Sequence, residues 1–202
     1  MTIGAKRHSA RARFSRSALG EGEPLTFRPV TKRNLADFET LFSAPGAPKY
    51  CWCMVWRRSP AEAKNNDPAS RKRQMFERIG RGVPVGLLAY DGETPVAWVS
   101  IAPRDTYRNL GGPEAKPGET IWSLACFFVP RRLRRQGMTR RLIAAAIDHA
   151  RKKGATVVEA YPVAPDAPSY RFMGFVPVFA EAGFTEVGRA GHRRHVMRLE
   201  SE

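Results

Sequence analysis

Apolar residues recur along this chain with two periods, which predicts an alternation of strands and helices. Alternating or continuous apolar runs predict strands at residues 25–30, 84–90, 95–102, 119–129, 156–161, 184–188 and 195–199. Stripes at helical spacing predict a helix between Thr31 and the Pro- and Gly-rich residues 44–48, and further helices at 69–79, 137–153 and 176–182. This order predicts an α/β fold with a mixed sheet of about six to seven strands, flanked by about four helices.

The strand at 119–129 and the helix at 137–153 form the clearest pair in this pattern. The strand is continuously apolar toward its end, which is typical of a central strand. Lys152, Lys153 and Gly154 mark the end of the helix, since basic residues suit its negative pole and glycine suits the position that follows. The helix carries a regular apolar stripe, formed by Met138, Leu142, Ile143, Ala146, Ile147 and Ala150.

Length and composition are those of one full-sized domain, which we expect to span residues 24–202. Residues 1–23 are rich in Arg, Ser, Ala and Gly, and are predicted to form a disordered basic tail. A transit peptide has a similar composition, but no other feature of the chain supports an organelle. No apolar run approaches the roughly 20 residues that a bilayer requires, and no secretory apolar segment opens the chain. We therefore expect a cytoplasmic protein without a membrane span.

Positive charge is concentrated in two segments. The formal net charge is +15, from 34 Lys and Arg against 19 Asp and Glu. Residues 1–20 contribute five arginines and lysines, residues 131–141 contribute six arginines, and neither segment contains an acid. Such a balance predicts contact with anions but does not identify them.

The second basic segment lies where the central strand runs into the long helix. A helix start presents free backbone N–H groups and the positive end of the macrodipole. Gly137 removes a side chain where a phosphate must come close, and the surrounding arginines add charge. These features together predict a site for a phosphate or pyrophosphate. A solvated basic helix start, or a nucleic-acid patch, is the alternative that an arginine run without a flanking strand would favour.

The same segment resembles a motif of the GNAT superfamily of N-acyltransferases. That family carries Arg/Gln-x-x-Gly-x-Gly/Ala at this junction, and Arg134-x-x-Gly137-x-Thr139 is in register with it. Ala182-Gly183-Phe184 is similar to the family's glycine–phenylalanine signature after the last helix. The resemblance extends in element order over residues 25–200.

The resemblance implies an N-acetyltransferase that moves an acetyl or related acyl group from coenzyme A to a primary amine, which attacks the thioester directly. Phe128 and Val129 would pair with the pantetheine arm where the central strand splays from its neighbour. Arg131, Arg132 or Arg141 would meet the 3′-phosphate. The pyrophosphate would bind at the turn, with the cofactor-binding residues Arg134, Arg135, Gln136, Gly137, Met138, Thr139 and Arg140.

Three positions depart from the family pattern. Thr139 stands where the family prefers Gly or Ala, which predicts a slightly wider phosphate turn. Phe179 stands where an aromatic hydroxyl often acts as general acid, and it has no proton to give. The glutamate that some members use as base falls near Ser123. The catalytic residues therefore stay open, with Ser123, Tyr161, Tyr170 and Glu119 as candidates, and positioning alone can supply much of the rate.

The cluster Cys51-Trp52-Cys53-Met54-Val55-Trp56 lies between the first two predicted helices, where GNAT members build acceptor specificity. We assign Trp52 to the substrate pocket, and Val55 and Trp56 to the core. The three cysteines make no disulfide framework or zinc set, so no metal is expected. We predict inert thiols at Cys51 and Cys53, because nothing nearby in the sequence would clearly lower a pKa.

Two other functions compete with the enzyme. The net charge and the basic tail permit a nucleic-acid-binding protein, although helix-turn-helix, zinc-finger and RNP-type signatures are missing from the sequence. Phe179 permits a catalytically silent acyl-CoA sensor. The sequence names neither the acceptor amine, which is a small molecule or a peptide, nor the acyl length, and a homodimer stays open.

Overall fold

The computed structural model describes residues 24–200, so the predicted tail at residues 1–23, and any nucleic-acid binding through it, lie outside the described part. Within residues 24–200 the predicted α/β class is confirmed, with a seven-stranded sheet and four α-helices. The predicted order of strands and helices is also observed. The elements are β1 Thr26–Pro29, α1 Leu35–Ser43, α2 Pro68–Gly80, β2 Leu87–Asp91, β3 Thr94–Pro103, β4 Ile121–Phe128, α3 Met138–Lys152, β5 Val157–Ala160, α4 Val176–Glu181, β6 Thr185–Ala190 and β7 Arg194–Glu200.

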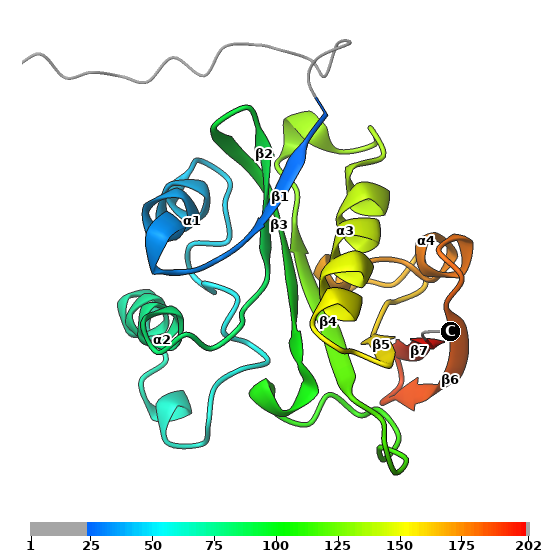
Figure 1. Cartoon of the computed structure of the whole chain (residues 1–202). Helices are drawn as coiled ribbons and strands as arrows, with labels where there is room; N and C mark the ends of the chain where they lie inside the picture. Colours follow the sequence, from blue (N-terminus) through cyan, green and yellow to red (C-terminus); the bar gives the residue numbers. More distant parts are fainter. Residues whose placement is uncertain (1–23, 201–202) are drawn as a thin grey trace, which may run out of the picture.

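The sheet has the strand order β1-β2-β3-β4-β5-β7-β6. Its neighbours run antiparallel except for β4 and β5, which are parallel and are joined by α3. A parallel pair needs such a crossover, and the helix covers the strands that it connects. In Figure 1, β4 lies in the middle of the sheet, as its apolar sequence predicts.

Helices cover both faces of the sheet. Figure 1 shows α1 and α2 on one side and α3 on the other. Aromatic side chains dominate the α1 and α2 side, where Phe38 stacks on Phe42 and meets the edge of Trp98. The α3 side is richer in aliphatic residues, and all six residues of the predicted helical stripe are buried there. Apolar burial on both faces explains why β4 reads as a continuous apolar run.

The parallel pair of β4 and β5 is short, and this leaves β4 open along its last residues. Pairing extends from Ile121 opposite Val157 to Leu124 opposite Ala160, whereas β4 continues to Phe128. The chain after β5 turns away, since Val163 pairs with Phe175 and Arg194 instead. Among the described residues, β4 therefore has no strand partner on this side beyond Leu124.

A β-bulge lies at the same place. In the β3–β4 ladder Ser100 is opposite Cys126 and Ile101 is opposite Leu124, so Ala125 has no residue opposite it. A bulge bends its strand and re-aims the side chains that follow. The bulge and the end of pairing with β5 thus coincide within one segment of β4.

Among residues 24–200, no helix is both long and apolar enough to cross a bilayer.

Candidate functional site

The turn after β4 is held by two buried apolar side chains. Leu133, in the short 3-10 helix η4 (Arg131–Leu133), and Met138, at the start of α3, are each 2% exposed. Between these anchors the backbone is left-handed at Arg135 (φ 62°) and at Gly137 (φ 73°). A Cβ on Gly137 would meet no atom within 4 Å, so the glycine serves the backbone conformation rather than a packing need.

The start of α3 has no side-chain cap. Gly137 occupies the N-cap position and cannot supply one. The first backbone bond into the helix runs from the N–H of Arg141 to the carbonyl of Gly137. The N–H groups of the preceding turn therefore have no partner inside the helix, and they carry its positive end. The N-terminus of α3 is therefore suited to bind an anion.

The basic side chains of the turn are exposed, and some are held by neighbours. Nε of Arg134 donates to the carbonyl of Val129 at 3.0 Å, which folds that guanidinium back over the turn. Arg140 donates from Nε to Glu181 of α4 at 2.7 Å. The six arginines of residues 131–141 keep the surface around the helix start positive.

An apolar pocket of about 280 Å³ adjoins the turn on the α1 side. Phe128 lines it, and Arg131 and Arg132 contribute to its wall. Arg131 and Arg132, which are expected to meet the 3′-phosphate, thus lie next to Phe128, which is expected to pair with the pantetheine arm.

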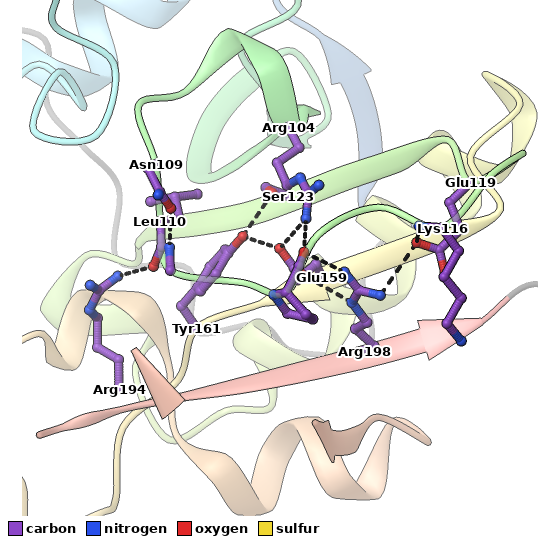
Figure 2. Close-up of polar contacts among 12 residues, drawn as sticks. Arg104, Asn109, Leu110, Lys116, Glu119, Ser123, Glu159, Tyr161, Arg194 and Arg198 are labelled. Atoms are coloured by element: carbon purple, nitrogen blue, oxygen red, sulfur yellow. Dashed lines mark hydrogen bonds and ion pairs between the residues drawn. The ribbon is translucent and has the colours of Figure 1, made fainter. Parts of the chain in front are cut away.

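A chain of buried polar groups connects β4 to β5. Ser123 and Glu159 are directly opposite each other in the parallel pair, and both are completely buried. The hydroxyl of Tyr161 donates to the carboxylate of Glu159 and lies 3.2 Å from the Ser123 hydroxyl. Because the Tyr161 proton is committed to Glu159, Ser123 donates to the Tyr161 oxygen (Figure 2).

Arginines neutralise the buried carboxylate. Nε of Arg198 in β7 donates to Glu159 at 2.8 Å, and Arg104 lies 3.6 Å from the same carboxylate. Arg198 also reaches Glu119 at 3.4 Å, which extends the network to the loop before β4 (Figure 2). A buried carboxylate requires such partners. The backbone of Gly112 covers it so closely that a Cβ there would lie 2.3 Å from a Glu159 oxygen.

Tyr161 also faces a pocket. It lines a cavity of about 310 Å³ together with Tyr107 and residues of the loop that follows β3. Burial, and then the negative charge of Glu159, raise the pKa of Tyr161 well above its usual range. The phenol is therefore neutral at physiological pH. The side chain is completely buried, and its hydroxyl is held between Glu159 and Ser123.

The structure brings together three of the four candidate catalytic residues. Ser123 and Tyr161 are in contact, and Glu119 joins them through Arg198 and Glu159. Tyr170 is not part of this hydrogen-bond network, and its ring lies 6.1 Å from that of Trp56. Glu159 was not anticipated from the sequence, although a single acid in the apolar run Val157–Ala160 was a visible signal.

The aromatic cluster before α2 is placed differently from the prediction for Trp52. Trp52 is 5% exposed and stacks on Phe42 in the core, and it lines neither pocket. Trp56 is buried as predicted, and its partly buried neighbour Val55 packs against the same cluster. The sequence indicates no neighbour that would clearly lower the pKa of Cys53, whereas in the fold the thiol of Cys126, and then the charge of Arg57, lower it. Cys126 becomes a neighbour only through folding, since it is distant in sequence.

Comparison with known proteins agrees with the geometry of the turn and the opened strand pair. A family model described as the acetyltransferase (GNAT) family matches residues 51–175. This chain belongs to the GNAT acetyltransferase family. It is by membership an acyl-CoA-dependent acyltransferase, and the resemblance seen in the sequence is confirmed. No curated protein matches the sequence.

Solved structures share the fold at low identity. The PaiA N-acetyltransferase from Thermoplasma acidophilum, solved in complex with coenzyme A, is 12% identical, with a TM-score of 0.53 over 89% of this chain and 100% of its own. The ribosomal-protein-S5-alanine acetyltransferase from Vibrio fischeri is 14% identical, with a TM-score of 0.55 over 91% and 96%. An N-acetyltransferase from Staphylococcus aureus is 11% identical, with a TM-score of 0.53 over 88% and 98%.

Phe179 is one of the positions that depart from the family pattern. Phe179 is completely buried and packs edge-on against Phe184 of the Gly-Phe signature. Its ring therefore belongs to the core between α4 and the sheet. The described residues contain no group of three or more His, Cys, Asp or Glu side chains that could hold a metal ion.

Proposed function

We propose that this GNAT member is an N-acetyltransferase that transfers an acetyl group from acetyl-CoA to a primary amine. The observation that carries the proposal is the meeting of two backbone features at one edge of β4. The strand loses its β5 partner after Leu124, and it then runs through η4 into the uncapped start of α3. One ligand with an extended arm and a pyrophosphate would satisfy both features.

The residues present fit coenzyme A. The N–H groups of residues 135–140 lie in the left-handed turn and the first turn of α3, where a pyrophosphate would accept hydrogen bonds. Phe128 and Val129 lie on the open part of β4 and just beyond it, where peptide-like groups of the arm would pair as an added strand. Bound acetyl-CoA supplies a thioester that is reactive toward amines.

Tyr161 is proposed as the group that takes the proton from the amine. Tyr161 is a completely buried residue of the wall of the 310 Å³ pocket, and its own proton is held by Glu159. As Tyr161 accepts the amine proton, its phenolic proton passes to the Glu159 carboxylate. Ser123 holds the phenol in position from the opposite side. Tyr161 and Ala125 of the bulge belong to the same buried cluster, which supports a relay near the opened part of β4.

The test is acetyl transfer by the full-length protein. The protein is incubated with acetyl-CoA and a panel of primary amines, including peptides with a free N-terminus, and each acceptor is analysed by mass spectrometry. Matched alcohols and N-blocked peptides serve as controls. Acetylation of amines but not of the matched controls supports the proposal. Transfer confined to hydroxyl acceptors would contradict N-acyl specificity. Binding of acetyl-CoA without any transfer would leave the acyl-CoA sensor.

A further inference from the structure

The cysteine- and tryptophan-rich segment before α2 has no role in the function proposed above. Trp52 (φ 48°) and Cys53 (φ 56°) are consecutive non-glycine residues in the left-handed region. This conformation is strained for a residue other than glycine and persists only where the surroundings enforce it. The backbone is thus held in a conformation that directs the Cys53 side chain into the core.

A second thiol packs against the buried cluster that contains Cys53. Cys126 lies on β4, next to the bulge and opposite Ser100 of β3. Cys53 interacts with the thiol of Cys126 and with the side chains of Trp98 and Ser100. Cys53 is 7% exposed and Cys126 is partly buried. The two free cysteines come from segments that only the fold brings together.

A buried cation lies beside this pair. Arg57 is 3% exposed, and the two N–H groups of its Nη2 are shared among Val85 O (2.8 Å), Ser100 Oγ (2.9 Å) and Tyr107 OH (2.6 Å), while its guanidinium lies 4.0 Å from the centre of the Tyr107 ring. All three acceptors are neutral, and Nε and Nη1 of Arg57 have no hydrogen-bond partner. No carboxylate in the described part of the chain is within ion-pair distance of Arg57. A buried guanidinium is costly without a counter-ion.

The ionisation of the three cysteines fits this environment. Interaction with Cys126, and then the charge of Arg57, lower the pKa of Cys53. Interaction with Cys53 and burial raise the pKa of Cys126. Burial raises the pKa of Cys51 as well. A Cys53 thiolate that accepts a hydrogen bond from the Cys126 thiol would supply the negative charge that Arg57 lacks.

We propose that Cys53 and Cys126 form a peroxide-reactive thiol pair, in which Cys53 is the attacking thiolate and Cys126 is the resolving thiol. The Cys53 sulfur attacks one peroxide oxygen, the O–O bond breaks, and the hydroxide released takes up a proton to form water. The sulfenic acid left on Cys53 is attacked by the Cys126 sulfur. The S–O bond breaks, and hydroxide leaves with the Cys126 proton as a second water. The two sulfurs lose two electrons, which reduce the hydrogen peroxide to two waters.

The disulfide would tie the segment before α2 to β4 beside the bulge. If the N-acetyltransferase function proposed above is right, this position adjoins the thioester of bound acetyl-CoA, and oxidation would lower acyl transfer. That consequence rests on the proposed function, whereas the reaction of the thiols does not.

The experiment is oxidation of the folded full-length protein with stoichiometric hydrogen peroxide, followed by intact mass and peptide mapping. Loss of two hydrogens, with a peptide that joins Cys53 to Cys126, is expected in the parent and in Cys51→Ser. In Cys126→Ser, a 1,3-dione that traps sulfenic acids should label Cys53. The labelling does not depend on acyl transfer, so its failure is distinguishable from failure of the enzyme assay.

Three results would overturn the proposal. One is a disulfide that includes Cys51, and another is dione labelling at Cys51 rather than at Cys53 in Cys126→Ser. The third is a folded protein that keeps its mass under peroxide although the same protein in denaturant is oxidised. Circular dichroism of each variant establishes that it is folded before the oxidation is interpreted.

Discussion

Arg198 and Glu159 form an ion pair in the interior, with Nε of the arginine 2.8 Å from the carboxylate. Arg198 is 6% exposed and Glu159 is fully buried. The two residues are directly opposite each other on the adjacent strands β5 and β7, and their burial shields the pair from solvent. The carboxylate is also the group to which Tyr161 donates, and the stability of the pair therefore bears on the proposed proton relay.

Breaking this pair from one side is expected to destabilise the protein strongly. Glu159→Gln or Arg198→Met each leaves one buried charge without its main partner, at a cost of about 3–5 kcal/mol in the free energy of unfolding. The double variant Glu159→Gln/Arg198→Met should lose less than the sum of the single variants, because no isolated charge of the pair remains. Urea unfolding of the four proteins measures this coupling. Additive effects would show that the two groups act independently.

The glycine above Glu159 gives a second prediction. In Gly112→Ala the new methyl group would lie 2.3–2.5 Å from the atoms of the carboxylate, which its arginine partners hold in place. Overpacking of this kind costs about 1–3 kcal/mol in the free energy of unfolding. Gly188→Ala in β6 is the matched control, since its methyl group would meet no atom within 4 Å. Equal stability of the two variants would mean that the loop moves freely away from Glu159.

Tyr161→Phe tests the relay. The variant keeps the ring but removes the hydroxyl that bonds Glu159 and Ser123, so kcat should fall about a hundredfold or more if this hydroxyl carries the proton. The KM for acetyl-CoA should stay within twofold or so, because the phosphate turn is untouched. Tyr90→Phe is the control, since that hydroxyl bonds Asp37 at 2.8 Å on the α1 side. A Tyr161→Phe enzyme with the parent's kcat would exclude Tyr161 as the proton acceptor.

The contact between α2 and the segment that precedes it is predicted to lose stability at acid pH. Arg78 donates to Glu62 at 2.6 and 2.7 Å and to the carbonyl of Arg57 at 2.9 Å. The bond to Arg78 lowers the pKa of Glu62 to about 2. Because the folded pKa is below the unfolded one, the stabilisation is present above about pH 4.3 and is lost as the pH falls toward 2.

The variant Glu62→Gln measures this contribution. It should lower the free energy of unfolding by about 1–2 kcal/mol at pH 7, a value reduced by the partial hydration of the pair. The difference from the parent should shrink as the pH approaches 2. Glu77→Gln, in an exposed pair with Arg73 at 4.0 Å, should show little difference at any pH. A Glu62→Gln deficit that is constant with pH would contradict the account.

The order of elements could be predicted from the sequence because each element carries its own local pattern. The stripe from Met138 to Ala150 and the apolar run of β4 depend on neighbours in the chain, and so does the turn at Gly137. The predicted ends of the elements agree less well with the observed ones. The strand predicted at 84–90 begins at Leu87, because Gly86 has a φ of 147° that stops the regular strand.

The polar network could not be predicted, because its members are distant in sequence. Ser123, Glu159 and Arg198 come from three strands, and each alone is an ordinary strand residue. Arg57 and Cys53 are close in sequence, but the absence of a carboxylate around Arg57 within the described fold depends on tertiary packing. The same holds for Trp52, whose burial follows from stacking on Phe42 rather than from its place in a motif.

The most direct test of the central claim is calorimetric titration of coenzyme A into the full-length protein and two variants of Gly137. Asn and Asp both tolerate the left-handed backbone at this position, and the space around its Cβ is open. Gly137→Asn should bind coenzyme A within a few-fold of the parent. Gly137→Asp places a negative charge at the pyrophosphate and should bind more than about tenfold more weakly, a loss of at least about 1.4 kcal/mol. Equal binding by the two variants, or no binding by the folded parent, would contradict a coenzyme A site at the start of α3.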